Sequence, residues 1–98
     1  MEITILSGAE IDLFEAWREY EEWVPGLGDR FDEAFREATA RLLVHPHSAP
    51  RFAGPFRRML VHDFEHGIFY QVHGRRIVIS AVLLLRQDPD AILRRLGL

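Results

Sequence analysis

The sequence lacks cysteine and lysine, and it lacks any apolar run long enough to cross a membrane. Without cysteine there is no disulfide, no thiolate nucleophile and no cysteine-ligated zinc. Without lysine, all twelve basic residues are arginines, which bind phosphate and carboxylate well but are poor general bases. The longest apolar run spans residues 77–85, whereas a membrane-spanning helix needs about 20 residues. No basic segment precedes an apolar run at the N-terminus, so we expect a cytoplasmic protein with no membrane contact.

Familiar catalytic motifs are missing as well. The sequence has no glycine-rich phosphate loop and no nucleophile elbow. Two histidine pairs suggest metal ligands, namely His45 with His47 and His62 with His66. A metal site needs three or four convergent ligands, but Pro46 restricts the first pair and a predicted turn separates the second. We therefore expect neither a metal nor a cofactor.

Charge is distributed unevenly along the chain. Residues 1–40 contain eleven acidic residues and three arginines, a net charge of −8. Residues 41–98 contain nine arginines and four acidic residues, a net charge of +5. If the first part forms helices and the second a sheet, the molecule has an acidic side and a basic side. The basic side is suited to phosphate or to an acidic partner segment, or its arginines pair with acids of the helices.

The chain is organised around residues 56–86, which predict three consecutive strands. These strands are expected at about residues 56–63, 68–73 and 77–86. The last strand has Ser80 as its only polar residue between positions 77 and 85, so we expect it to be the central strand, covered on both faces. Alternation divides its side chains into two faces. These are Val78, Val82 and Leu84 on one face, and Ile77, Ile79 and Leu83 on the other.

A short strand at residues 2–6 and an amphipathic helix come first. Ser7 and Glu10 have the spacing of a capping box at the start of this helix. Its buried stripe is expected to be Leu13, Ala16, Trp17, Tyr20, Trp23 and Val24. Its solvent face is expected to be Asp12, Glu15, Arg18, Glu19 and Glu22.

A second amphipathic helix follows the break at residues 25–28. It begins near Gly28 or Asp29, ends before Pro46 and packs against the first helix as an antiparallel hairpin. Residues 47–55 are expected to form a surface loop, and residues 90–96 a short final helix. The sequence thus predicts a single α+β domain over residues 1–98, in which a strand and a helical hairpin precede a mainly antiparallel sheet.

Three arginines are the strongest candidates for function. Arg57 and Arg58 begin the first strand of the meander, and Arg86 ends the last one. The alternative is that they are ordinary solvated residues at strand ends. Tyr70, in the middle strand, offers a proton donor or a surface on which a base can stack, although half-buried core tyrosines are more common.

The order of these features resembles the RelE/ParE superfamily, the toxins of bacterial type II toxin–antitoxin pairs. The resemblance covers nearly the whole chain. It rests on five segments: Pro25-Gly26-Leu27-Gly28 leading into Arg30-Phe31, Pro46, Arg57-Arg58, Ile68-Phe69-Tyr70-Gln71-Val72, and Leu85-Arg86-Gln87-Asp88-Pro89.

The resemblance implies a cytoplasmic toxin that is neutralised by an antitoxin encoded beside it. RelE-like members cut mRNA on the ribosome, whereas ParE-like members inhibit DNA gyrase. Carried over by position, Arg58 and Arg86 are the functional arginines and Tyr70 is a weaker match. The third reading is a non-toxic relic that serves only as an interaction module.

Several departures from the family favour binding over RNA cleavage. The usual Phe-Pro-Tyr is Phe64-Glu65-His66 here, and leucines replace the histidine that often precedes the arginine of the last strand. Cleavage of RNA needs one group to accept the 2′-hydroxyl proton and another to protonate the leaving oxygen. Arginines supply neither role well, so the sequence favours a gyrase-type toxin, with a ribosome-dependent mRNA endonuclease as the alternative.

The antitoxin is expected on the face of the sheet that the helical hairpin leaves open. A helix or an added strand of the antitoxin would cover this face, and its acids would meet the arginines. The expected contact residues are Arg57, Arg58, Arg86, Val82 and Leu84.

Overall fold

The computed structural model describes all 98 residues and contains five strands and three helices. In chain order these are β1 (Glu2–Ile5), α1 (Ser7–Trp23), α2 (Leu27–Val44), β2 (Arg51–Ala53), β3 (Phe56–Leu60), β4 (His66–His73), β5 (Arg76–Leu84) and α3 (Pro89–Arg95). The strands form one sheet in the order β1-β5-β4-β3-β2. Only β1 and β5 are parallel, and every other pair is antiparallel. The predicted α+β fold is confirmed.

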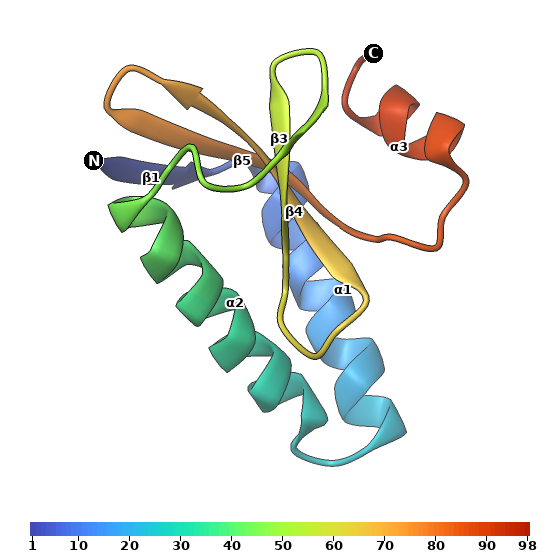
Figure 1. The fold of residues 1–98 in the computed structure, drawn as a ribbon. Helices are drawn as coiled ribbons and strands as arrows, with labels where there is room; N and C mark the ends of the chain where they lie inside the picture. Colours follow the sequence, from blue (N-terminus) through green and yellow to red (C-terminus); the bar gives the residue numbers. More distant parts are fainter.

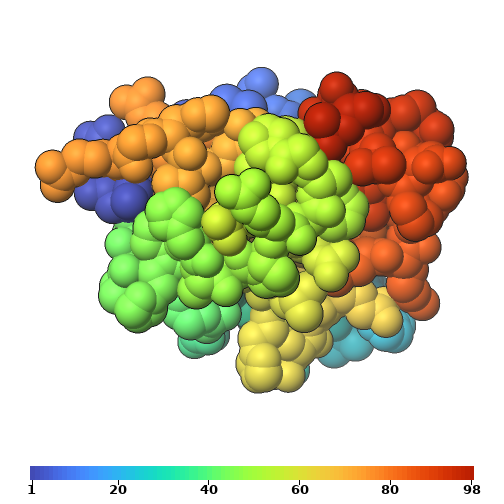
Figure 2. Space-filling view, turned by 45° about the horizontal axis from the view of Figure 1, so that its top comes forward, coloured from blue at the N-terminus to red at the C-terminus, as the bar shows by residue number.

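The two faces of the sheet are covered by different helices (Figure 1). The α1–α2 hairpin packs on one face over the larger core, whose strand side chains include Ile68, Ile77 and Ile79. On the other face, Ile92 of α3 packs with Phe69, Ala81 and Leu83. In Figure 2 the C-terminal segment lies beside the β2–β3 hairpin. The face expected to be open is therefore partly covered by the chain itself.

A bulge in β5 overturns the predicted grouping of its side chains. Phe69 of β4 is opposite Ala81, but the next residue, Tyr70, is opposite Ile79, so Ser80 has no partner. The extra residue reverses the alternation. Val82 consequently lies with Ile79 beneath the helical hairpin and is only 2% exposed. β5 is paired on both edges, as expected, although β4 is the middle strand of the five.

The loop expected at residues 47–55 contains a strand. β2 spans only three residues and pairs with the start of β3, where Arg51 is opposite Arg57 and Ala53 is opposite Phe56. Its length and its position between two prolines hid it from sequence analysis, because prolines normally mark loops. β2 pairs only with Phe56 and Arg57 of β3, so the rest of the outer edge of β3 has no neighbouring strand.

The start of α1 is also different from the prediction. Leu6 is the residue before the first turn, Ser7 is already helical, and no side chain caps the helix. The reason is that Leu6 remains tied to the sheet, because its N–H donates to the carbonyl oxygen of Ile79. The capping position is thus occupied by Leu6, whose apolar side chain cannot accept a hydrogen bond from the first turn.

The tryptophans of α1 are less buried than their spacing predicted. Trp23 is 76% exposed, and Val24 beside it is exposed as well. Trp17 is half-buried and its indole N–H donates to the carboxylate of Asp29 on α2, at 3.0 Å. Figure 1 shows that the helical hairpin extends beyond the turn between β3 and β4, so the end of α1 has no sheet beneath it.

Asp12 was expected on the solvent face of α1 but is buried. Its carboxylate accepts the backbone N–H of Val82 at 3.0 Å and two N–H groups of Arg95, at 3.0 and 2.7 Å. β1 ends at Ile5, opposite Ile79, so Asp12 occupies the edge of β5 that β1 leaves free. One carboxylate thus joins α1, β5 and α3.

None of the three helices is both long and apolar enough to cross a lipid bilayer. The two long helices approach each other closely at Gly28. A Cβ atom at this position would lie 2.5 Å from the carbonyl oxygen of Trp17, so only glycine fits without a shift.

Candidate functional site

Arg57 and Arg58 point to opposite faces of the sheet, as neighbours on a strand must. In the ladder, Arg57 is opposite Tyr70 and Arg58 is opposite Phe69. Arg57 donates to the carbonyl oxygen of Ala49 at 2.8 Å and to that of His47 at 3.2 Å. Its guanidinium therefore holds the segment between α2 and β2 in place.

Tyr70 lies on the same side of the sheet as Arg57 and is completely buried. Its hydroxyl donates to the carbonyl oxygen of Pro46 at 2.8 Å. Burial raises the pKa of Tyr70 above its usual value, and the nearby Arg57 opposes this rise only in part. Tyr70 is thus a protonated core residue with no surface on which a base can stack.

Arg58 lies on the opposite side, next to the segment covered by α3. Its guanidinium carbon is 5.5 Å from the centre of the Phe52 ring, a distance at which cation and ring attract each other. It also lines a hollow of about 370 Å³ at the outer edge of β3. This basic hollow is formed by Arg41, Ser48, Ala49, Pro50, Arg58, Met59, Leu60 and His62, and no acidic residue lines it.

The basic hollow adjoins backbone groups that have no strand partner. Along β3, the N–H of Val61 donates inward to His66, and the N–H of Arg58 donates outward to Pro50. Because the direction alternates, the N–H and C=O of Leu60 also point outward. Leu60 has no partner in β2, and its side chain is exposed. This edge can accept a short additional strand.

Arg86 belongs to a different surface. It forms an ion pair with Glu65 at 2.9 Å, and its side chain is 76% exposed. Together with Leu84 it lines a groove of about 710 Å³ between the end of α1 and the β3–β4 turn. This aromatic groove is lined by Glu19, Tyr20, Trp23, Leu27, Asp63, Phe64, Glu65, His66, Leu84 and Arg86.

A histidine–tyrosine pair lies at the inner end of the aromatic groove. The hydroxyl of Tyr20 is 3.0 Å from Nδ1 of His66. Burial lowers the pKa of His66 to about 4, although Asp12 and Glu65 oppose this shift. The imidazole is therefore neutral near pH 7, and burial also raises the pKa of Tyr20, so the hydrogen bond joins two uncharged groups. The sequence suggested His66 as a metal ligand and as part of the departure from Phe-Pro-Tyr, but it contained no signal for the pairing with Tyr20.

The structure does not bring the histidines together as ligands. His62 is exposed and its Nε2 lies 3.4 Å from Asp63, whereas His66 is buried against Tyr20. No group of three or more histidine, aspartate or glutamate side chains is arranged to hold a metal ion.

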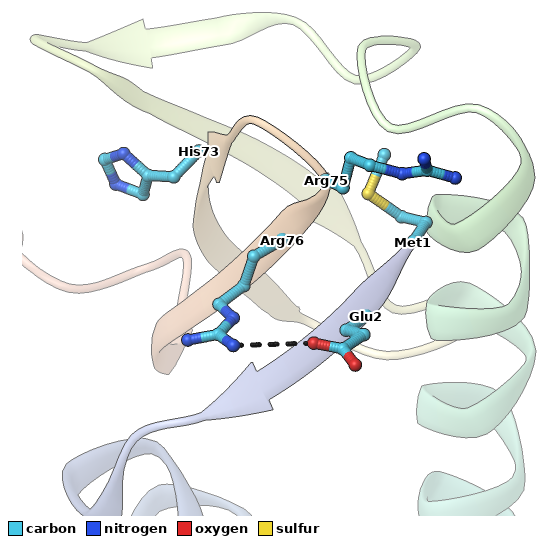
Figure 3. Close-up of a pocket in the computed structure, with 5 residues that line it drawn as sticks. All are labelled: Met1, Glu2, His73, Arg75 and Arg76. Atoms are coloured by element: carbon cyan, nitrogen blue, oxygen red, sulfur yellow. Dashed lines mark hydrogen bonds and ion pairs between the residues drawn. The ribbon is translucent and has the colours of Figure 1, made fainter.

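A further hollow lies at the far end of the sheet, beside the N-terminus. It is lined by Met1, Glu2, His73, Arg75 and Arg76 (Figure 3). The guanidinium of Arg76 points toward Glu2, and their charged atoms are 3.4 Å apart. Figure 3 shows that His73 and Arg75 extend in other directions, so the side chains of this hollow do not converge on one ligand position.

Comparison with known proteins identifies the family. Residues 3–89 match the family model described as the ParE toxin of the type II toxin–antitoxin system parDE. The chain belongs to the ParE toxin family. Its fold is similar to a chain of a solved structure described as the chromosomal ParDE system from P. aeruginosa, with a TM-score of 0.76 and 18% identity. That similarity covers 88% of this chain and 97% of the other. No curated protein matches the sequence.

In this ParE-family toxin the predicted site residues are distributed over four places. Arg58 lines the basic hollow, and Leu84 and Arg86 line the aromatic groove. Arg57 and Tyr70 bond to the loop after α2. The fifth predicted contact residue, Val82, is buried beneath α1 and offers no surface to a partner.

Proposed function

We propose that this ParE-family toxin acts in the cytoplasm by binding DNA gyrase, and that it does not cut RNA. The observation that carries the proposal is the separation of the candidate catalytic side chains. Arg58 and Tyr70 are on opposite faces of the sheet, and Arg86 is paired with Glu65 in the aromatic groove. A nuclease needs its acid, its base and its charge-stabilising group around one phosphate.

The remaining titratable side chains support a binding function. Tyr70 is inaccessible, and its raised pKa keeps the phenol protonated near pH 7, so it cannot accept a proton there. His66 is 5% exposed and has a pKa of about 4, far below the value suited to proton transfer near pH 7. The guanidinium groups of Arg58 and Arg86 can bind a partner but do not exchange protons near pH 7.

We also propose that a cognate antitoxin neutralises the toxin by covering the basic hollow. Arg41, Arg58 and His62 face this hollow without an acidic neighbour among its lining residues. An extended acidic segment would satisfy the outward backbone groups of Leu60 and place its carboxylates beside the two arginines. This arrangement keeps the predicted role of Arg58, and it does not involve Val82.

The target is tested by comparing the toxin with Arg86→Ala, after expression in a host cell and with purified protein. We expect growth arrest with induction of the DNA-damage response, inhibition of gyrase supercoiling in vitro, and no codon-position cuts in translated mRNA. We expect Arg86→Ala to reduce the inhibition at least several-fold. Its melting temperature should change by no more than about 5 °C, because an exposed ion pair contributes about 0–1 kcal/mol.

Arg75→Ala is the matched control, because Arg75 is an exposed arginine at the opposite end of the sheet and lies outside both candidate surfaces. Primer extension that shows cuts in the wild type and none in Arg58→Ala would identify a ribosome-dependent mRNA endonuclease instead. A large drop in the melting temperature of Arg86→Ala would show that Arg86 has a structural role.

A further inference from the structure

The aromatic groove differs from the basic hollow in both lining and charge. Its floor is apolar, and Tyr20, Phe64 and Leu84 contribute to it. The ring centres of Tyr20 and Phe64 are 5.0 Å apart in an edge-to-face arrangement, so the floor is a packed surface and does not depend on a ligand for its shape. Its volume of about 710 Å³ lies within the range of about 300–1,000 Å³ that is typical of binding pockets.

The wall of the groove is acidic. Glu19, Asp63 and Glu65 line it, and Arg86 is its only basic residue. The three acids and the one arginine have a net charge of −2. Arg86 is already paired with Glu65, so Glu19 and Asp63 are left to attract a cation. The C-terminal end of α1 points toward the same region and has no basic residue in its last turn. Its free carbonyl groups therefore add partial negative charge, which favours a cation.

Trp23 provides an aromatic surface next to these acids. It follows Glu19 by one helical turn, so the two side chains are neighbours on the same side of α1. Trp23 is 76% exposed and Val24 beside it is 48% exposed. The apolar surface therefore continues out of the groove, which suits a protein segment better than a small molecule.

We infer that the aromatic groove binds a segment of a partner protein in which an apolar side chain lies next to an arginine or lysine. The apolar side chain would fill the floor between Tyr20, Phe64 and Leu84. The cation would lie between Glu19 and the ring of Trp23, where charge and the aromatic quadrupole both attract it. The acidic wall repels nucleic acid and the acidic segment proposed for the basic hollow. This inference does not require the proposed antitoxin contact or a gyrase target, although Arg86, the residue tested for gyrase inhibition, also lines this groove.

The experiment is selection of a random displayed 12-residue peptide library on the purified full-length protein. We expect enrichment of peptides with an arginine or lysine within two positions of a large apolar residue. One enriched peptide is then synthesised, and its Kd is measured for the wild type, Trp23→Ala, Glu19→Gln and Phe14→Ala. We expect binding to weaken about tenfold in Trp23→Ala and about threefold in Glu19→Gln.

Phe14→Ala is the matched control, because Phe14 is an exposed aromatic residue on the same helix but does not line the groove. Its Kd should equal that of the wild type. The inference is overturned if no peptide is enriched, if the enriched peptides are acidic, or if Trp23→Ala binds as tightly as the wild type. Self-association in sedimentation experiments that Trp23→Ala abolishes would assign the groove to a second copy of the chain and would also overturn it.

Discussion

At the scale of single residues, burial gives Tyr70 and His66 a structural role in place of a chemical one. Tyr70 is opposite the half-buried Arg57, and His66 lines the same groove as the exposed Arg86. Both are nevertheless core residues with hydrogen-bond partners inside the molecule. Each partner comes from a distant segment, Pro46 for Tyr70 and Tyr20 for His66. These contacts fix the loop after α2 and the end of α1 against β4.

His66 predicts a pH dependence of stability. Its pKa is about 4 in the folded protein and about 6.5 when unfolded, so the unfolded chain binds more protons between these values. Stability from the neutral imidazole is complete above pH 6.5 and is lost as the pH falls toward 4. We expect the free energy of unfolding to fall by about 2 kcal/mol more in the wild type than in His66→Gln between pH 7.5 and pH 5.

Urea unfolding of both proteins at pH 7.5, 6 and 5 measures this difference. The comparison with His66→Gln cancels the titration of carboxylates, since both proteins contain the same ones. Parallel pH profiles would show that the imidazole is protonated without penalty in the folded state.

Residue types alone could not have separated the arginines. Arg57 and Arg58 are adjacent residues of the same type, but successive side chains of a strand point to opposite faces. Arg57 therefore bonds to internal carbonyl groups, whereas Arg58 lines the basic hollow. The carbonyl groups that bind Arg57 belong to the loop before β2, so the path of this loop decides which of the two arginines has internal partners. The sequence predicted that these arginines lie at a strand start, and it contained no signal for their separate partners.

At the scale of secondary structure, Asp12 and Arg95 attach α3 to the rest of the fold. The bidentate pair joins the C-terminal helix to α1, and the same carboxylate accepts the N–H of Val82. We expect Asp12→Ala to reduce the free energy of unfolding by about 3 kcal/mol, because it leaves a buried N–H and a partly buried guanidinium without partners. Arg95→Ala should cost less, since its side chain is 36% exposed.

Chemical denaturation of both single variants and of the double variant tests this coupling. The double variant should be more stable than the sum of the single effects predicts, because each single change already breaks the pair. Glu10→Ala, an exposed change on α1, is the control and should alter stability by less than about 0.5 kcal/mol. Additive effects would contradict the role of the pair.

Periodicity predicted the long elements correctly but did not predict the irregular ones. The helical hairpin and the strands β3, β4 and β5 follow from amphipathic and apolar patterns. The bulge at Ser80 depends on pairing with β4, and β2 on pairing with β3. Asp12 looked like a solvent-facing acid because its partner, Arg95, lies 83 residues away. Long-range contacts of this kind have no local sequence signal.

At the scale of the whole molecule, the charge segregation seen in the sequence is largely not cancelled by ion pairs. Two salt bridges join the acidic first part of the chain to the basic second part, namely Asp12 with Arg95 and Glu2 with Arg76. The other three lie within one part. Among the arginines of the strands, Arg76 pairs with Glu2 and Arg57 bonds to carbonyl groups. Arg51 and Arg58 form no salt bridge and remain available to a partner, which agrees with the first alternative drawn from the sequence.

The placement of the antitoxin is the prediction that follows from this charge distribution. Hydrogen exchange of the toxin, alone and in complex with its co-expressed antitoxin, should show slower exchange along β3 and at the outward N–H of Leu60. This N–H has no strand partner in the toxin alone, whereas an added strand would bond to it.

Arg41→Ala combined with Arg58→Ala should weaken the complex at least tenfold. The control pair, Arg75→Ala with Arg94→Ala, should not weaken it, because both are exposed arginines outside the hollow. Protection confined to α1 and α2, with the strands unchanged, would place the antitoxin on the opposite side of the molecule.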